Sequence, residues 1–197
     1  RRVLFRSVGH KIAETVIHVT ERMTYTNVNK ILTHADEAVT KKYQELVPMF
    51  FLMKELSEIV RKNRKKRGAI DFDFPESKVI LDENGKPVDI YEYEHNSATD
   101  LIEDFMLLAN ETVAEEYYFN EIPFVYRTHE EPDSEKIESV FSMIRAGKIK
   151  VKKAKENVSP KEIQQVLKEI EGLECEPFFA RLLLRSMKQA KYTTDRS

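Results

Sequence analysis

The chain has 197 residues, of which 41% are hydrophobic and 34% are charged, and its formal net charge is −2. This composition supplies enough apolar side chains for one substantial core, which excludes an intrinsically disordered protein. No apolar run approaches the roughly 20 residues that a bilayer-spanning helix requires. The single cysteine, Cys175, excludes an internal disulfide and suits a reducing compartment, so we expect a cytoplasmic protein.

The N-terminal third predicts one strand followed by two helices. Residues 14–24 are rich in β-branched side chains that largely alternate, which favours a strand, and residues 26–33 follow as a short helix. Between residues 38 and 66, apolar side chains recur every three or four positions, which predicts one long amphipathic helix ended by Gly68. Its apolar stripe consists of Leu46, Met49, Phe50, Met53, Leu56 and Val60.

A hairpin and a second long helix are expected in the middle of the chain. Residues 78–94 predict the hairpin, because the Asn84-Gly85 pair supplies the positive φ that a tight turn requires. Ser97, followed by Asp100, opens a helix that runs to about Phe119. A short strand at residues 122–126 follows.

Three further helices are expected in the last third. Residues 133–146 and 176–191 carry apolar side chains at helical spacing. Between them, Ser159 and Glu162 form a capping box with a proline at the first helical position, which predicts a helix ending at Gly172. The fold class is therefore α+β, with several packed helices and a mixed or antiparallel sheet.

The long helix at residues 97–119 separates into two faces when its side chains are placed at steps of about 100°. One face is acidic and is expected to be solvated: Asp100, Asp104, Glu111 and Glu115. The opposite face is apolar: Ile102, Met106, Ala109, Val113 and Tyr117. Glu103 and Asn110 lie on the border of the apolar face, where they either form structural hydrogen bonds or line a cleft that binds a polar ligand.

The segment from Arg67 to Glu76 combines carboxylates and aromatic rings outside any predicted helix. Asp71 and Asp73 are two carboxylates, which is too few for a metal site. Phe72 and Phe74 are either core residues or a stacking platform for a base. Six basic residues precede or open this segment and either contact phosphates or form a solvated helix end: Arg61, Lys62, Arg64, Lys65, Lys66 and Arg67. The five histidines show no metal-ligand spacing.

Five motifs, taken in chain order, resemble the ribonuclease II and ribonuclease R family, and the bacterial ribonuclease R branch most of all. They are E-R-M-T-Y-T-N-V-N-K-I-L at 21–32, R-G-A-I-D-F-D-F-P-E at 67–76, D-L-I-E-D-F-M-L-L-A-N-E at 100–111, P-F-V-Y-R-T-H-E-E-P-D-S-E-K at 123–136 and L-L-L-R-S-M-K-Q-A-K-Y at 182–192. The resemblance covers residues 14–192 and implies part of the family's catalytic domain, the RNB domain. Residues 1–13 are expected to be disordered or artefactual, and residues 193–197 form a truncated tail.

The resemblance implies a processive, sequence-independent 3′→5′ exoribonuclease that hydrolyses RNA to nucleoside 5′-monophosphates with Mg²⁺. It implies that Tyr25 and Glu103 select ribose over deoxyribose near the 3′ end, and that Phe72 stacks on the terminal bases. Asn110 and Arg67 are further expected RNA contacts. The implied partner is the 3′ end of single-stranded RNA, with no DNA, and the enzyme is expected to be a monomer.

Two departures from the family pattern limit this expectation. The family's metal-binding aspartates lie N-terminal to everything in this chain, and its arginine-bearing S-P-I-R-R-Y motif lies just beyond its end. The chain is therefore expected to contain no complete catalytic site and no metal ligands, and to be inactive by itself. The alternative is a non-catalytic RNA-binding or scaffold module of the same fold, and a third interpretation is a helical adaptor for protein partners.

Overall fold

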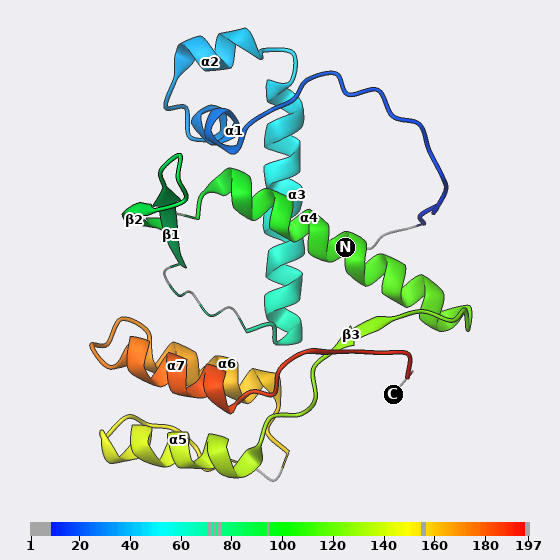
Figure 1. The fold of residues 1–197 in the computed structure, drawn as a ribbon. Helices are drawn as coiled ribbons and strands as arrows, with labels where there is room; N and C mark the ends of the chain where they lie inside the picture. Colours follow the sequence, from blue (N-terminus) through cyan, green and yellow to red (C-terminus); the bar gives the residue numbers. More distant parts are fainter. Residues whose placement is uncertain are drawn as a thin grey trace, which may run out of the picture. The chain divides into compact units, whose positions relative to one another are not determined.

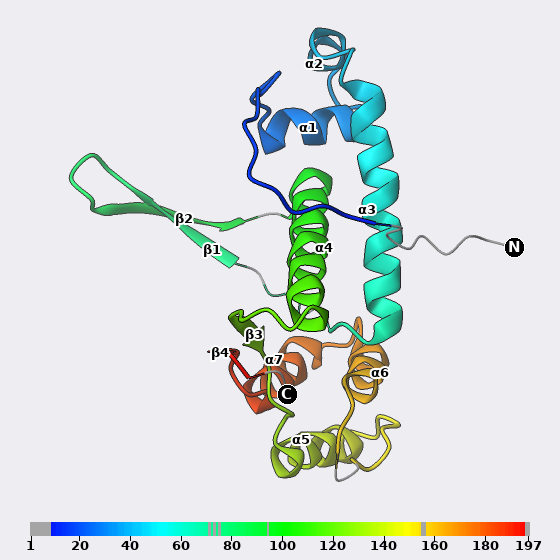
Figure 2. The same cartoon turned by 90° about the vertical axis from the view of Figure 1, so that its right-hand side faces the viewer.

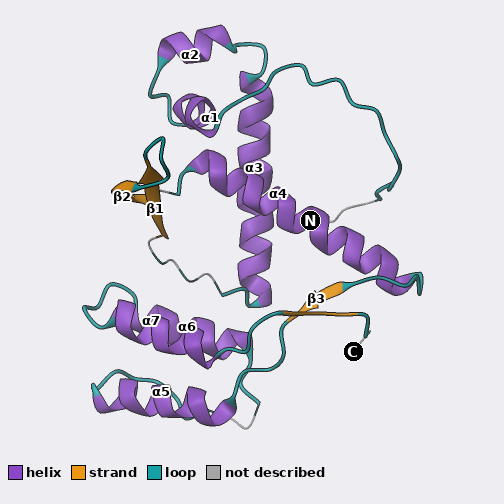
Figure 3. Ribbon diagram, in the orientation of Figure 1, coloured by secondary structure: helices purple, strands orange, loops and turns teal. Residues whose placement is uncertain are grey.

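The computed structural model describes residues 9–70, 72, 74, 76–93, 95–154 and 157–195. Within these residues the chain forms seven helices and two antiparallel two-stranded sheets, which confirms the α+β class (Figure 1). Helices carry most of this secondary structure (Figure 3). The chain divides into two compact units: unit 1 comprises residues 1–63 and 94–122, and unit 2 comprises residues 64–93 and 123–197. None of the helices described is both long enough and apolar enough to cross a membrane.

Unit 1 is an all-helical assembly. Its helices are α1 (Tyr25–Leu32), α2 (Glu37–Lys42), α4 (Ser97–Phe119) and the greater part of α3 (Val47–Arg67). Helices α3 and α4 cross one another, and α1 packs against α4 (Figures 1 and 2). The core of this unit consists of the buried side chains Ile31, Leu32, Phe50 and Leu101.

Side-chain caps set where α1 and α4 begin. Thr24 accepts a hydrogen bond from the backbone N–H of Asn27 and so starts α1 at Tyr25. Asn96 and Thr99 form a reciprocal capping box at the start of α4. The expected bounds of α4 are confirmed, although the N-cap is Asn96 and not Ser97.

Two expectations for the N-terminal region are wrong. Residues 14–24 form no strand, because neither of the sheets found among the described residues offers them a partner. The single helix expected over residues 38–66 is interrupted between α2 and α3. Helix α3 starts at Val47, immediately before Pro48, and proline fits only the first turn of a helix because it has no N–H to donate.

Unit 2 contains the four strands and the last three helices that the described residues form. They are β1 (Glu76–Leu81), β2 (Pro87–Tyr93), β3 (Tyr126–Thr128), β4 (Lys191–Thr193), α5 (Ser134–Ala146), α6 (Pro160–Ile170) and α7 (Glu176–Ser186). The core of this unit joins the three helices through Ile137, Phe141, Ile144, Ile163, Val166, Ile170 and Leu183. The predicted capping box of Ser159 and Glu162 is confirmed at the start of α6.

The sheet of β3 and β4 corrects two predictions. The short strand expected at 122–126 forms at Tyr126–Thr128, and the last helix ends at Ser186 instead of residue 191. The segment after α7 pairs with β3, and Lys188 and Lys191 both bind the carboxylate of Glu130. Residues 191–193 therefore pair with β3 as a strand and do not continue the last helix.

The predicted hairpin is confirmed as β1 and β2, joined by a turn at residues 82–86. Asp82 accepts hydrogen bonds from the backbone N–H groups of Asn84 and Lys86, and Gly85 has φ of +79°. Several large apolar side chains of both strands are exposed: Val79, Ile80, Leu81, Val88, Ile90 and Tyr91. The hairpin thus has little core of its own among the described residues.

Gly68 ends α3 as expected, and it does so within a close contact. Its φ is +106°, and a β-carbon at this position would lie 3.0 Å from Cγ of Lys161 in α6. Gln164 of α6 donates hydrogen bonds to the carbonyls of Lys65 and Ala69 on either side. The contact holds the segment that leads to Phe72 against α6.

We predict that Gly68→Ala lowers the free energy of unfolding by at least about 1–2 kcal/mol, the cost of a left-handed non-glycine residue, with the steric contact added. Gly172→Ala is the matched control, because Gly172 also follows a helix with positive φ but has open space around it. Chemical denaturation measures both changes. Equal losses would show that the contact with Lys161 has no effect.

Candidate functional site

A cavity of about 770 Å³ lies within unit 1 beside the start of α1. Its walls come from the segment around Tyr25, from Phe50 and Met53 of α3, and from Leu101 and Ile102 of α4. The side chain of Tyr25 is half exposed. The phenol is therefore accessible to a ligand while its ring forms part of a largely apolar wall.

Glu103 follows Ile102 directly on α4, and it is exposed. Tyr25 and the residue next to Glu103 thus line one cavity, and α1 packs on α4. Neither Tyr25 nor Glu103 is sealed in the interior. Asn110, the other border residue of α4, is exposed as well.

The face that α4 turns inward differs from the face that its amphipathic pattern predicts. Asp104, expected on a solvated acidic face, is 0% exposed, and Asp100 is partly buried. Ile102 and Met106, expected to be packed, are 44% and 53% exposed. The prediction is wrong for these residues because the inward side of α4 carries Ala98 and Leu101 together with Asp104, whose carboxylate binds polar groups of α3.

These polar contacts form a network around the carboxylate of Asp104. Ser57 Oγ donates a hydrogen bond of 2.7 Å to its Oδ2, and Nε and Nη2 of Arg61 lie 3.0 and 2.9 Å from the same oxygen. Nη1 of Arg61 donates to Asp100 at 2.9 Å. We call Ser57, Arg61, Asp100 and Asp104 the α3–α4 network.

The charge of Arg61 is strongly favoured within this network. Its burial lowers the pKa of the guanidinium, but hydrogen bonds and charges from Asp100 and Asp104 more than offset that effect, so the pKa lies above its usual value. The buried carboxylate of Asp104 thus faces a permanent positive charge. A carboxylate without such a partner would be very costly to bury.

One possible metal-binding group occurs among the described residues. Ligand atoms of His95, Asp100 and Glu103 lie within 4.8 Å of one another. Asp100 already forms an ion pair with Arg61, and Mg²⁺ prefers carboxylates and water to imidazole. These three residues therefore do not fit a magnesium pair of the kind that cleaves phosphodiesters.

Phe72 and Arg67 belong to unit 2, whereas Tyr25, Glu103 and Asn110 belong to unit 1. The ring of Phe72 packs against the core of unit 2 and stacks on Phe74, with 5.9 Å between centroids and 6° between planes. Arg67, the last residue of α3, is exposed. The expected carboxylates Asp71 and Asp73 lie outside the described residues.

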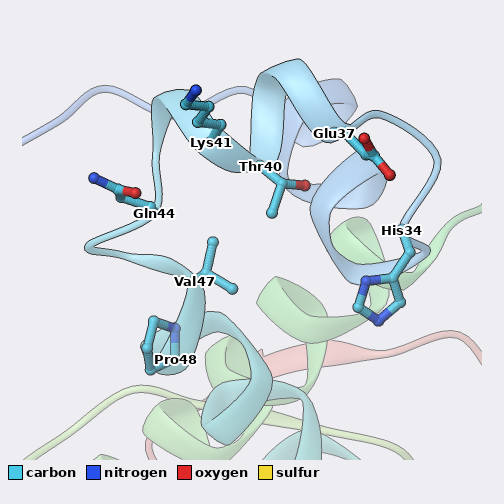
Figure 4. Close-up of a pocket in the computed structure, with 7 residues that line it drawn as sticks. All are labelled: His34, Glu37, Thr40, Lys41, Gln44, Val47 and Pro48. Carbon is cyan, nitrogen blue, oxygen red and sulfur yellow. The ribbon is translucent and has the colours of Figure 1, made fainter.

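A second recess, of about 470 Å³, lies beside α2 (Figure 4). Its side chains come from His34, from α2 and the turn after it, and from Val47 and Pro48 of α3. They are spread around the recess and do not converge on one point (Figure 4). None of the expected site residues lines it.

Sequence reasoning missed the α3–α4 network. The one signal available was the spacing of Asp100 and Asp104, which puts two carboxylates one turn apart on the same side of a helix. Their partner lies about 40 residues upstream, within a block of basic residues in which no single arginine stands out.

Comparison with known proteins assigns the chain to a family. The family model described as the RNB domain matches residues 5–197. The chain belongs to the RNB domain family. Its relatives include ribonuclease R of Thermotoga maritima, 40% identical over 189 residues, and ribonuclease R 1 of Lactococcus lactis, 36% identical over 190 residues.

These alignments cover 95% and 96% of this chain but only 26% and 23% of the two relatives, so the chain spans about a quarter of their length. Among solved structures, Mycoplasma genitalium RNase R in complex with ribose-methylated single-stranded RNA is 30% identical, with a TM-score of 0.71. That similarity covers 87% of this chain and 26% of the other. The expected resemblance to bacterial ribonuclease R is confirmed.

We predict that Arg61→Met lowers the free energy of unfolding by about 3–5 kcal/mol, because it leaves the fully buried carboxylate of Asp104 without its cation. The matched control is Lys30→Met, which removes the half-exposed partner of Asp36 in the same unit and costs at most about 1 kcal/mol. Urea denaturation of both variants measures the difference. Similar losses would show that the α3–α4 network contributes no more than a surface ion pair.

Proposed function

We propose that the chain is a segment of a ribonuclease R-type 3′→5′ exoribonuclease and that it recognises the ribose at the 3′ end of single-stranded RNA. The RNB domain match and the ribonuclease R relatives support the enzyme class. The Mycoplasma genitalium structure with ribose-methylated single-stranded RNA supports RNA as the ligand. In this proposal the parent enzyme releases nucleoside 5′-monophosphates processively, in the cytoplasm and as a monomer.

The observation that carries the ribose assignment is the cavity that Tyr25 shares with Leu101 and Ile102 of α4. Glu103 follows Ile102 in the sequence and is exposed, but it is not itself a wall of the cavity. A ribose 2′-hydroxyl both donates and accepts hydrogen bonds, whereas deoxyribose offers neither at that position. A carboxylate can accept from the hydroxyl and a phenol can donate to it. Tyr25 and Glu103 together therefore supply the two partners that distinguish RNA from DNA.

Binding of any base sequence needs contacts that ignore base identity. An aromatic ring stacks on every base, and cationic side chains bind phosphates without regard to sequence. Phe72 and Arg67 are proposed for these two roles, and Asn110 for a polar contact. Phe72 also packs on the core of unit 2, so its proposed role uses the part of the ring that the core leaves accessible.

The cleavage step is proposed to use residues outside this chain. Two-metal hydrolysis of a phosphodiester requires ions that activate water and stabilise the leaving oxygen. The trio of His95, Asp100 and Glu103 does not fit that task. The parent enzyme is proposed to hold Mg²⁺ elsewhere, and the isolated chain is proposed to bind RNA without cleaving it.

In the parent enzyme, we predict that Glu103→Gln reduces the preference for RNA over a matched DNA strand about 10- to 100-fold, the value of a hydrogen bond to a charged acceptor. Degradation rates on the two strands measure the preference. Glu115→Gln is the control, because Glu115 is an exposed acid on the same helix. An unchanged preference in the Glu103 variant would contradict the proposed role.

For the isolated 197-residue chain, we predict that Phe72→Ala weakens poly(A) binding about 5- to 100-fold, as expected for the loss of one stacked base. Tyr25→Ala is expected to weaken it as well, through the loss of the proposed hydrogen bond to the ribose. Lys153→Ala, on an exposed loop of unit 2, serves as the control and changes the affinity little. Fluorescence anisotropy with labelled poly(A) measures all three. If neither substitution changed the affinity for poly(A), an adaptor for protein partners would be the better interpretation of this chain.

A further inference from the structure

The cavity beside α1 combines an apolar wall with a single charged side chain. Its volume is about 770 Å³, and Arg22 is the one charged residue among the described residues that line it. Small-molecule sites typically measure roughly 300–1,000 Å³ and combine mostly apolar walls with a few polar groups. The size and the lining of this cavity therefore fit a small ligand that carries one negatively charged group. Its apolar wall includes Phe50, Met53, Leu101 and Ile102.

Arg22 is held at this cavity by the two residues that follow it. Met23 packs against the core of unit 1, and Thr24 caps α1, so the path of the chain after Arg22 is fixed. Arg22 itself is exposed, and its guanidinium has no hydrogen-bond or ion-pair partner within the described part of the chain. Arg61 and Arg145, by contrast, each bind a carboxylate. The charge of Arg22 is therefore available to an anion that enters the cavity.

The side chains around the cavity match the three parts of a ribonucleotide. A guanidinium binds a phosphate through two parallel N–H···O hydrogen bonds, and the phenol of Tyr25 can both donate to and accept from a ribose hydroxyl. The apolar wall offers a surface for the face of a base. Arg22 and Tyr25 line the same cavity, so a ligand that fills it meets both side chains. A ribonucleotide is a ligand that uses all three features at once.

We propose that Arg22 binds the phosphate of the nucleotide whose ribose Tyr25 contacts, so that the cavity is a site for a free ribonucleoside 5′-monophosphate. This inference rests on the proposed ribose contact of Tyr25 and makes no use of Glu103. A ribonucleoside 5′-monophosphate is the product that the proposed enzyme releases. Product and RNA therefore compete for this cavity, and the product inhibits the parent enzyme.

Methionine side chains allow the site to be located directly. Met23 and Met53 line the cavity, whereas Met143 and Met187 belong to unit 2. The full 197-residue chain is labelled with ¹³C at the methionine methyl groups and titrated with AMP, and NMR spectra are recorded. AMP is expected to shift the signals of Met23 and Met53 and to leave those of Met143 and Met187 in place. If the signals of Met23 and Met53 do not move, the proposed site is overturned.

The comparison of AMP with adenosine isolates the contact to the phosphate. AMP is expected to bind at least about tenfold more tightly, the value of a hydrogen bond to a charged group. Arg22→Gln is expected to lower the affinity for AMP to that for adenosine and to leave the affinity for adenosine unchanged. Arg127→Gln, which removes another exposed arginine, is the matched control and changes neither affinity. Added NaCl is expected to reduce the advantage of AMP in the unmodified chain, because salt screens an exposed charge pair.

The comparison of AMP with its 2′-deoxy analogue, dAMP, tests the ribose contact separately. The unmodified chain is expected to bind AMP more tightly than dAMP, because the analogue lacks the 2′-hydroxyl. Tyr25→Phe keeps the ring and removes the phenol oxygen, so this variant is expected to bind AMP and dAMP equally. It is also expected to keep the advantage of AMP over adenosine, since Arg22 is unchanged.

The outcomes separate the phosphate contact from the proposed function. If Arg22→Gln binds AMP as tightly as the unmodified chain does, the role of Arg22 is overturned, and ribose recognition stands as long as Tyr25→Phe removes the preference for AMP over dAMP. If the unmodified chain binds AMP and dAMP equally, ribose recognition by Tyr25 fails. A loss of the phosphate contribution in Arg22→Gln alone, and of the ribose preference in Tyr25→Phe alone, supports both.

Discussion

The contact between the Arg61 guanidinium and the buried carboxylate of Asp104 is the interaction on which the arrangement of unit 1 depends. A carboxylate with no exposed surface requires a charged partner and further hydrogen bonds, and Arg61 and Ser57 provide both. Because Asp100 binds the same guanidinium, two successive turns of α4 are held against α3. The side of α4 that carries Glu103 faces away from this contact and is exposed.

A buried ion pair is a poor source of stability when compared with apolar packing, since the cost of removing two charges from water is large. It does fix the relative position of the two side chains, because the planar guanidinium binds a carboxylate only within a narrow range of geometries. In α4 the ion pair lies on the same buried side as Ala98 and Leu101, while Ile102 and Met106 stay about half exposed. A local departure from hydrophobic patterning of this kind is what a functional constraint on the helix would produce.

Both units expose large apolar side chains. They occur on α4 at Ile102 and Met106, and on both strands of the hairpin, for example at Val79 and Ile90. Apolar surfaces of this extent normally mark contacts with other parts of a protein. The chain spans about a quarter of the length of its ribonuclease R relatives.

Local chemistry was enough to predict several elements from the sequence. The capping box of Ser159 and Glu162, the glycine turn of the hairpin and the bounds of α4 are confirmed, because caps and turns depend on residues close together in the chain. The strand expected at 14–24 and the helix expected to continue to residue 191 were wrong. A strand exists only where a partner lies beside it, and propensity does not reveal the partner.

The sequence by itself was enough to recognise the family motifs, to place most of the helices and to show which polar residues α4 carries. Only the tertiary structure decided that Asp104 is buried, because its partner Arg61 lies about 40 residues upstream in a separate helix. Periodicity describes the faces of a helix, but the direction in which they turn is decided by what packs against them. Here the buried side of α4 combines Ala98 and Leu101 with Asp104, whose carboxylate the core would exclude without the guanidinium of Arg61.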